Sequence, residues 1–173
     1  LDSFENSLAI VMEDFGGKSL ADILKSYKIS LEDKLLISID IADAIMQIQR
    51  QKVIHKDINP SNILYNIHTK QLKIIDFGIS TDLNTEKPQN VYILEGTLPY
   101  ISPEQTGKVN RAIDYRSDYY SLGVTLYEIF TGQLPFSGDN MEIAYSHIAK
   151  IPKEPKLINN EIPKAVSDII MKL

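Results

Sequence analysis

Residues 53–62 read VIHKDINPSN, in which two apolar residues are followed by a mostly polar run. It places a His, a Lys, an Asp and two Asn within eight residues, with a Pro among them. Asn, Asp, Pro and Ser are the residues of turns, so a plain solvent-exposed loop would have the same composition. The neighbouring sequence therefore has to show whether residues 53–62 are a plain loop or part of a functional site.

Two short apolar runs, 63–65 and 72–75, come directly after this loop and predict a pair of strands joined by the hairpin turn NIHTK. Asp57 and Asn62 precede the first strand, and Asp76 ends the second within IIDFG. Such a hairpin can bring the two loops together. Carboxylate and amide oxygens are ligands that Mg²⁺ prefers, and a carboxylate that the metal does not need could accept a proton from a hydroxyl.

The rest of the chain is predicted to be mostly helical. Ser30 caps a long helix over 31–51, with an apolar face that we list as Leu35, Ile39, Ala42, Ile45 and Ile48. A central buried helix is predicted with Ser117 as its N-cap and Gly132 at its end. Shorter helices are predicted within 19–27, within 140–150 and from 165 onward, an apolar strand within 7–15, and a long loop over 80–99.

Composition describes an ordinary globular chain of 173 residues, enough for one domain. The net charge of −5 argues against nucleic acid as a partner, because phosphate binding requires a basic face. The absence of Cys excludes disulfides and cysteine metal sites, and suits a reducing compartment such as the cytoplasm. We see no signal peptide and no apolar run long enough to span a membrane.

Four motifs together resemble the larger lobe of a eukaryotic-type protein kinase. HKDINPSN at 55–62 is similar to the catalytic loop H-R-D-x-x-x-x-N, and residues 76–78 are the DFG of the metal-binding motif. GTLPYISPE at 96–104 resembles the end of the activation segment, with SPE where APE is usual, and DYYSLGVTLYEIFTGQLPF at 118–136 resembles the buried helix that follows. The motifs occur in the family's order and spacing over nearly the whole chain.

The resemblance implies an α+β, protein kinase-like fold. The chain is then a partial kinase domain over 1–173, in which 1–15 form the last strand of the N-terminal lobe and the hinge. Residues 16–173 form a mainly helical C-terminal lobe with short β-hairpins, and most of the N-terminal lobe is missing. The implied activity is ATP- and Mg²⁺-dependent transfer of the γ-phosphate to Ser or Thr of a protein substrate in signal transduction.

Site roles follow from the same resemblance. Asp57 would orient the substrate hydroxyl and accept its proton, while Asn62 and Asp76 would hold Mg²⁺. Thr97 would form a hydrogen bond near Asp57, a feature typical of serine/threonine kinases. The residues assigned to the adenine pocket are Met12, Glu13, Phe15 and Leu64.

Structural roles are implied for other residues of the same motifs. His55 and Phe77 would stack in the interior, and Asp118 would anchor the backbone of the catalytic loop. His68 is expected in the hairpin turn and His147 on a helix surface.

A narrower resemblance rests on the wording of HKDINPSN, LKIIDFGIST and EGTLPYISPEQTGKVNRAIDYRSDYYSLG. These stretches look like the kinase module at the front of very large bacterial and fungal signalling chains. Those chains join the module to an AAA-type ATPase region, sensor domains and often a histidine kinase. Flanking ATPase and sensor domains are therefore expected partners within the same protein.

Lys56 stands where the family has the Arg of H-R-D. Lys keeps the charge and loses the planar fork, so the resemblance by itself does not imply activation by loop phosphorylation and leaves it open. Ser80, Thr81 and Thr85 are the candidate acceptors, and a solvated Ser/Thr loop is the alternative.

Asn59 stands two residues after Asp57, where the family usually carries a Lys that touches the transferred phosphate. Asn can donate a hydrogen bond but supplies no charge, which leaves Lys56 or Lys73 as candidates to compensate. Lys18 and Ser61 occupy positions that are acidic in kinases of basic substrates, so no strong preference for Arg is expected.

The chain shows no G-x-G-x-x-G loop, no strand Lys for the phosphates and no helix Glu to pair with it. Glu104 usually meets a buried Arg, and none of the three Arg residues fits that place, so an unpaired buried carboxylate is expected. We therefore expect poor phosphate transfer from these 173 residues alone. A pseudokinase that acts as a regulatory interaction module is the alternative function, and a small-molecule kinase of related fold is a third.

Overall fold

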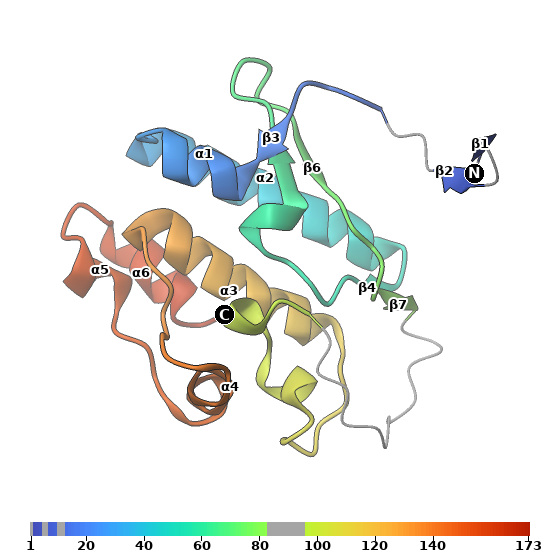
Figure 1. Cartoon of the computed structure of the whole chain (residues 1–173). Helices are drawn as coiled ribbons and strands as arrows, with labels where there is room; N and C mark the ends of the chain where they lie inside the picture. Colours follow the sequence, from blue (N-terminus) through green and yellow to red (C-terminus); the bar gives the residue numbers. More distant parts are fainter. Residues whose placement is uncertain (1, 5–6, 10–12, 83–95) are drawn as a thin grey trace.

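The structure is a computed structural model that describes residues 2–4, 7–9, 13–82 and 96–173 (Figure 1). Met12 and Thr85, which the sequence singles out, lie outside these residues. The helices are α1 (Leu20–Ser26), α2 (Leu31–Arg50), α3 (Tyr115–Thr131), α4 (Asn140–Ala149), α5 (Pro155–Ile158) and α6 (Lys164–Ile170). The strands are β1 (Asp2–Phe4), β2 (Ser7–Ala9), β3 (Lys18–Ser19), β4 (Val53–Ile54), β5 (Ile63–Tyr65), β6 (Leu72–Ile74) and β7 (Thr81–Asp82). Three 3₁₀ turns complete the described elements: η1 (Pro60–Asn62), η2 (Leu98–Tyr100) and η3 (Pro103–Thr106).

The core lies where α2 packs against α3 (Figure 1). Ser30 caps α2 as predicted, accepting a 3.0 Å hydrogen bond from the Asp33 N–H. The buried row of α2 is Ile37, Ile41 and Ile45. Burying side chains of this size contributes about 1.5–3 kcal/mol each, so this seam holds the two long helices together.

The predicted apolar face of α2 was wrong at two of its five residues, Ile39 and Ala42. Ile39 is 58% exposed and Ala42 is exposed, whereas Ile45 is buried. The helix carries apolar residues on two opposite sides, one containing Ile37 and Ile41 and the other containing Ile39 and Ala42. Periodicity identifies both sides, and only the position of α3 selects one of them.

Helix α3 is buried on almost every side, as predicted, and Gly132 ends it in the left-handed conformation with φ 77°. Its N-cap is Asp114 and not Ser117, because the Asp114 carboxylate accepts from the Arg116 N–H at 2.9 Å. Ser117 lies one turn inside the helix, and its hydroxyl points to Glu104. The predicted start was therefore three residues late.

Strands β3, β5 and β6 form a three-stranded antiparallel sheet in which β5 is central. The predicted hairpin of β5 and β6 is confirmed, with Leu64 paired to Lys73. Ile63 and Tyr65 of β5 are buried against the helices, whereas Leu64 is only partly buried on the other face. The two-residue strands β3, β4 and β7 were not predicted, since pairs this short carry no period.

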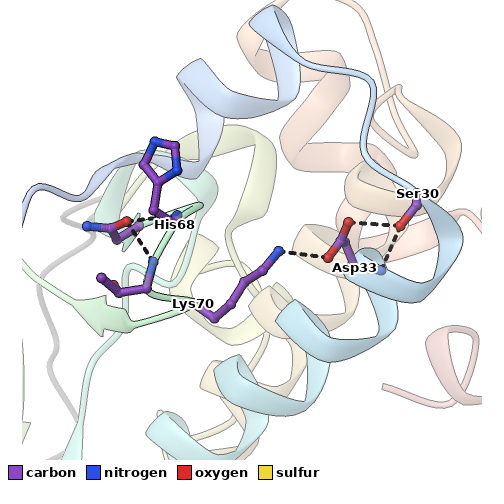
Figure 2. A network of polar contacts seen from close by, with 6 residues as sticks. Ser30, Asp33, His68 and Lys70 are labelled. Atoms are coloured by element: carbon purple, nitrogen blue, oxygen red, sulfur yellow. Dashed lines mark hydrogen bonds and ion pairs between the residues drawn. The ribbon is translucent and has the colours of Figure 1, made fainter.

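Polar contacts fix the hairpin turn to the long helix. Figure 2 shows Lys70 reaching Asp33 at the start of α2, at 3.0 Å, while Asp33 also accepts from the Ser30 hydroxyl. His68 lies in the turn as predicted, and its N–H donates to the Asn66 side chain at 2.9 Å. The contact between Lys70 in the hairpin turn and Asp33 thus helps to set the orientation of the sheet relative to α2.

Helices α4, α5 and α6 follow α3 (Figure 1). His147 of α4 was predicted on the surface, and this was wrong: it is 4% exposed, and the Tyr120 hydroxyl lies 2.8 Å from its Nδ1. The face of α4 that carries His147 packs against η2 and η3. No helix in the described part of the chain is both long and apolar enough to cross a bilayer.

Candidate active site

The loop 55–62 is anchored from beneath by Asp118 of α3. The carboxylate of this buried residue accepts from the His55 N–H at 2.9 Å and from the Lys56 N–H at 2.8 Å, which confirms the predicted anchor. Burial raises the pKa of Asp118, and the two N–H donors oppose that rise. Lys56 has a φ of 69°, a left-handed conformation that costs energy in a residue other than Gly. The anchor therefore holds the loop in a shape that it would not adopt by itself.

His55 is fully buried, and its Nε2 lies 3.1 Å from the Ile75 carbonyl. The predicted stacking with Phe77 is confirmed, with ring centroids 4.7 Å apart in an edge-to-face arrangement. Phe77 is nevertheless 46% exposed, so the described residues cover only part of this ring. His55 acts as a packed structural residue that joins the loop 55–62 to the DFG segment.

The Asp57 carboxylate accepts hydrogen bonds on both oxygens. Its Oδ1 accepts from the Thr97 N–H at 2.8 Å, and its Oδ2 accepts from Asn62 Nδ2 at 2.8 Å. Asn62 Nδ2 also donates to the Asp57 carbonyl at 2.9 Å. The structure thus brings Asp57, Asn62 and Thr97 into one hydrogen-bonded group, although Thr97 lies 40 residues along the chain.

Asp76 reaches this group through its neighbour Ile75, whose N–H donates to the Asn62 carbonyl at 2.9 Å. Asp76 is exposed, has a φ of 67°, and accepts from the Gly78 N–H at 3.2 Å. A non-Gly residue in this conformation occurs mostly where the surroundings impose it.

The donor atoms fit a hard cation. Both Nδ2 hydrogens of Asn62 are used on Asp57, which leaves Asn62 Oδ1 as an available acceptor, and Asp76 offers carboxylate oxygens. Such oxygen donors, completed by water and phosphate oxygens, match the coordination that Mg²⁺ prefers. Within the described ranges, no three or more His, Asp or Glu side chains gather as a metal site, so protein ligands alone do not form a cage.

The predicted adenine-site residues that the structure describes lie around one face of the sheet. Lys73, paired with Leu64 across the strands, forms an ion pair with Glu13, and its Nζ lies 5.0 Å from the centre of the Phe15 ring. Asn66 Nδ2 donates to the Phe15 carbonyl at 2.7 Å. Glu13, Phe15 and Leu64 are therefore brought together, whereas Met12 is outside the described residues.

Two residues of this region, Asn66 and Lys73, were not connected with Glu13 and Phe15 in the sequence-based prediction. No local signal marks them, because each acts on a segment more than 50 residues away. Lys73 was considered as a cation that compensates for Asn59, but it is engaged by Glu13. Lys56, the other candidate, is 2% exposed, so its side chain lies below the surface.

The segment after residue 95 docks on the loop 55–62 through backbone and side-chain contacts. Gly96 has a φ of 107°, and a Cβ there would lie 3.1 Å from the Lys56 carbonyl oxygen, so only Gly fits without strain. Gln105 Nε2 donates to the same carbonyl at 2.7 Å, while its Oε1 accepts from Ser102. This capping box was a missed signal, since Ser102 and Gln105 stand in the S-x-x-Q pattern.

Glu104 is buried, but it is not left without a donor as the sequence analysis expected. The Ser117 hydroxyl donates to its Oε1 at 2.6 Å. The Ser117 hydroxyl of helix α3 thus provides the Glu104 carboxylate with a hydrogen-bond donor, in place of the arginine that the resemblance implied.

Comparisons with known proteins agree with this arrangement. The family model described as "Protein kinase domain" matches residues 2–173. A probable serine/threonine-protein kinase of Clostridium perfringens is 38% identical over 165 residues, covering 94% of this chain and 24% of that protein. PrkC of Bacillus subtilis is 34% identical over 167 residues, covering 94% of this chain and 25% of that protein. PknB of Mycobacterium leprae is 34% identical over 167 residues, covering 94% of this chain and 26% of that protein.

The chain thus spans about a quarter of the length of these curated relatives. The predicted fold class is confirmed: a helix-rich chain with short antiparallel strand pairs, as in the C-terminal lobe of a kinase. With the family model covering nearly every residue, the chain belongs to the protein kinase domain family.

Proposed function

We propose that this chain is the catalytic C-terminal lobe of a serine/threonine protein kinase, with 1–15 as the last N-lobe strand and hinge and 16–173 as the C-lobe. One observation carries the proposal: the Asp57 carboxylate is held by the Thr97 N–H and by Asn62 Nδ2, each at 2.8 Å. A fixed carboxylate beside the segment 96–106 is what positioning of a substrate hydroxyl requires.

In the proposed reaction Asp57 receives the proton of a Ser or Thr hydroxyl. The hydroxyl oxygen forms a bond to the γ-phosphorus of ATP, the bond from that phosphorus to the β–γ bridging oxygen breaks, and ADP leaves. The Thr97 N–H donates to one carboxylate oxygen of Asp57 and Asn62 Nδ2 donates to the other. The two donors fix the orientation of the carboxylate and leave it able to accept a further hydrogen bond.

Asn62 and Asp76 would hold Mg²⁺, since their oxygen donors fit that ion. When bound, the ion neutralises the charge that develops on the phosphate oxygens. Asp76 and Asn62 are kept in register by the Ile75 N–H, which donates to the Asn62 carbonyl, and by His55 beneath it.

ATP would lie over the sheet face that carries Leu64, against the segment containing Met12, Glu13 and Phe15. Asn66 and Lys73 support that segment from the hairpin. The names of the relatives, which are serine/threonine-protein kinases, support a protein substrate with a Ser or Thr acceptor. Attachment to ATPase and sensor domains, and a place in cytoplasmic signalling, belong to the proposal on the motif wording described above.

The test is transfer of labelled γ-phosphate from ATP with Mg²⁺ to Ser/Thr peptides, using the full-length protein. Asp57→Asn should abolish transfer, and the matched variant Asp168→Asn, at an exposed residue of α6, should leave it intact. Transfer that survives in Asp57→Asn would overturn the assignment of the base.

A pseudokinase is the second candidate, favoured by the inward-facing Asn59 in place of a phosphate-binding Lys. A folded full-length protein that binds nucleotide, yet transfers no more phosphate than Asp57→Asn, would select this second function.

A further inference from the structure

Asn59 departs from the family pattern, and its position in the structure gives it a different task. It lies in the loop 55–62 between Asp57 and the η1 turn, and it is 1% exposed. The sequence suggested that its amide could donate a hydrogen bond to the transferred phosphate. At this degree of burial the side chain presents almost no surface to a ligand.

The hydrogen bonds of Asn59 are all directed inward. Its Nδ2 donates to the Asp57 carbonyl and to Asp57 Oδ1, both at 3.1 Å, and to Thr97 Oγ1 at 3.2 Å. Its Oδ1 accepts from the Ser61 N–H at 2.9 Å and so caps the η1 turn. One amide group therefore contacts the carboxylate, the threonine hydroxyl and the turn that carries Asn62.

The geometry also divides the amide into two functional halves. The Oδ1 atom serves the fold of the turn, while Nδ2 joins Asp57 to Thr97 of a segment 38 residues away. The Thr97 hydroxyl thereby accepts a hydrogen bond from Asn59, while the Thr97 N–H donates to Asp57 Oδ1 at 2.8 Å. The three residues form a closed ring of hydrogen bonds.

We infer that Asn59 is a positioning residue, which acts through Asp57 and Thr97 and makes no contact with the nucleotide. The inference rests on the proposed function and deepens it. Asn59 holds the end of the activation segment against the catalytic loop, so that the Asp57 carboxylate stays aimed at the acceptor hydroxyl. Its place in the reaction is therefore on the acceptor side of the site.

The decisive pair of variants in the full-length protein is Asn59→Asp and Asn59→Ala. Asp keeps the shape and the acceptor for the Ser61 N–H but removes both Nδ2 donors, whereas Ala removes everything. We expect both to lower kcat by about 10- to 100-fold, the scale of a modest misplacement of a reacting group. The ATP dissociation constant, measured by calorimetry, should stay within about twofold of the wild-type value, as a residue without nucleotide contact requires.

Thr97→Val completes a double-mutant cycle. Because Asn59 and Thr97 act in one ring, Asn59→Ala and Thr97→Val together should lower kcat by little more than either variant alone. Asn160→Ala, at an exposed turn residue, is the matched control and should change neither quantity.

Hydrogen exchange of the wild type and Asn59→Asp gives a readout that needs no transfer. We expect the Thr97 amide to exchange at least about tenfold faster in the variant, because its acceptor group loses its support. If the wild type transfers no phosphate, the proposed kinase activity fails, and the exchange rates alone decide the role of Asn59.

Three results would overturn the inference: ATP affinity that falls in parallel with kcat, additive effects in the cycle, or unchanged Thr97 exchange in Asn59→Asp. An unchanged kcat in Asn59→Asp would show that Asn59 serves only as the cap of the η1 turn.

Discussion

The Ser117 hydroxyl donates a 2.6 Å hydrogen bond to the buried carboxylate of Glu104, 13 residues earlier in the chain. The contact joins the end of the activation segment to the first turns of α3, the helix whose Asp118 anchors the loop 55–62. Neighbouring residues of one helix, Ser117 and Asp118, thus hold the two segments that form the site.

Ser117→Ala should destabilise the domain by about 1–3 kcal/mol, because it removes a donor from a buried carboxylate without giving water access to it. Urea unfolding followed by circular dichroism measures this change. Ser137→Ala, at an exposed position after α3, should change stability by less than about 0.5 kcal/mol. Equal stabilities of the two variants would show that the Glu104 contact contributes nothing.

Asn66→Asp should raise the KM for ATP by about 3- to 10-fold and leave kcat almost unchanged. Asp retains the oxygen that accepts from the His68 and Thr69 N–H groups, but it cannot donate to the Phe15 carbonyl. A net hydrogen bond is worth about 0.5–1.5 kcal/mol, which corresponds to this range.

Steady-state kinetics of the full-length protein with varied ATP provide the measurement for Asn66→Asp, with Asn160→Ala as the control. A loss confined to kcat would separate Asn66 from nucleotide binding.

The sequence predicted those parts of the site whose signal is local. Asp57, Asn62 and Asp76 stand at fixed offsets from short strands, so their neighbourhood followed from the hairpin of β5 and β6. Thr97 came only through the resemblance, since 40 residues separate it from Asp57.

Contacts made by tertiary packing could not be read from the chain. Tyr145 and Ile148, two apolar neighbours of His147, are exposed, so the pattern of α4 did not mark His147 as the residue that η2 and η3 would cover. Asn59 stands where the family carries a Lys that touches the transferred phosphate, and only the fold shows that its amide turns inward.

His147 should make stability depend on pH between about 6.5 and 4. Burial lowers its pKa to about 4, while the carbonyls of Leu98 and Pro99 oppose that shift. The unfolded chain therefore binds a proton near pH 6.5 that the folded chain refuses until about pH 4. The free energy of unfolding is unaffected by this residue above pH 7, falls as the pH drops through this window by up to about 3 kcal/mol, and levels off below it.

Urea midpoints at several pH values between 7.5 and 4 test the His147 prediction. His147→Gln should flatten the slope between pH 6.5 and 4, whereas His68→Gln, in the exposed hairpin turn, should retain it. The same slope in wild type and His147→Gln would assign the pH dependence to other groups.

The positions of Lys18 and Ser61 lead to a prediction about which residues the enzyme prefers near the acceptor of a peptide substrate. Both side chains are exposed, Lys18 on β3 and Ser61 on the η1 turn, at positions that are acidic in kinases of basic substrates. A lysine there repels a basic peptide, so the wild type should show no strong preference for Arg three residues before the acceptor.

Lys18→Glu should raise the rate for peptides with Arg at that position by about 5-fold, since one exposed charge pair is worth about 1 kcal/mol. A positional peptide library measures both quantities, and Lys172→Glu gives the same charge change at another exposed site. A wild-type profile dominated by Arg at that position would contradict the prediction, because neither Lys18 nor Ser61 offers a charge to bind it.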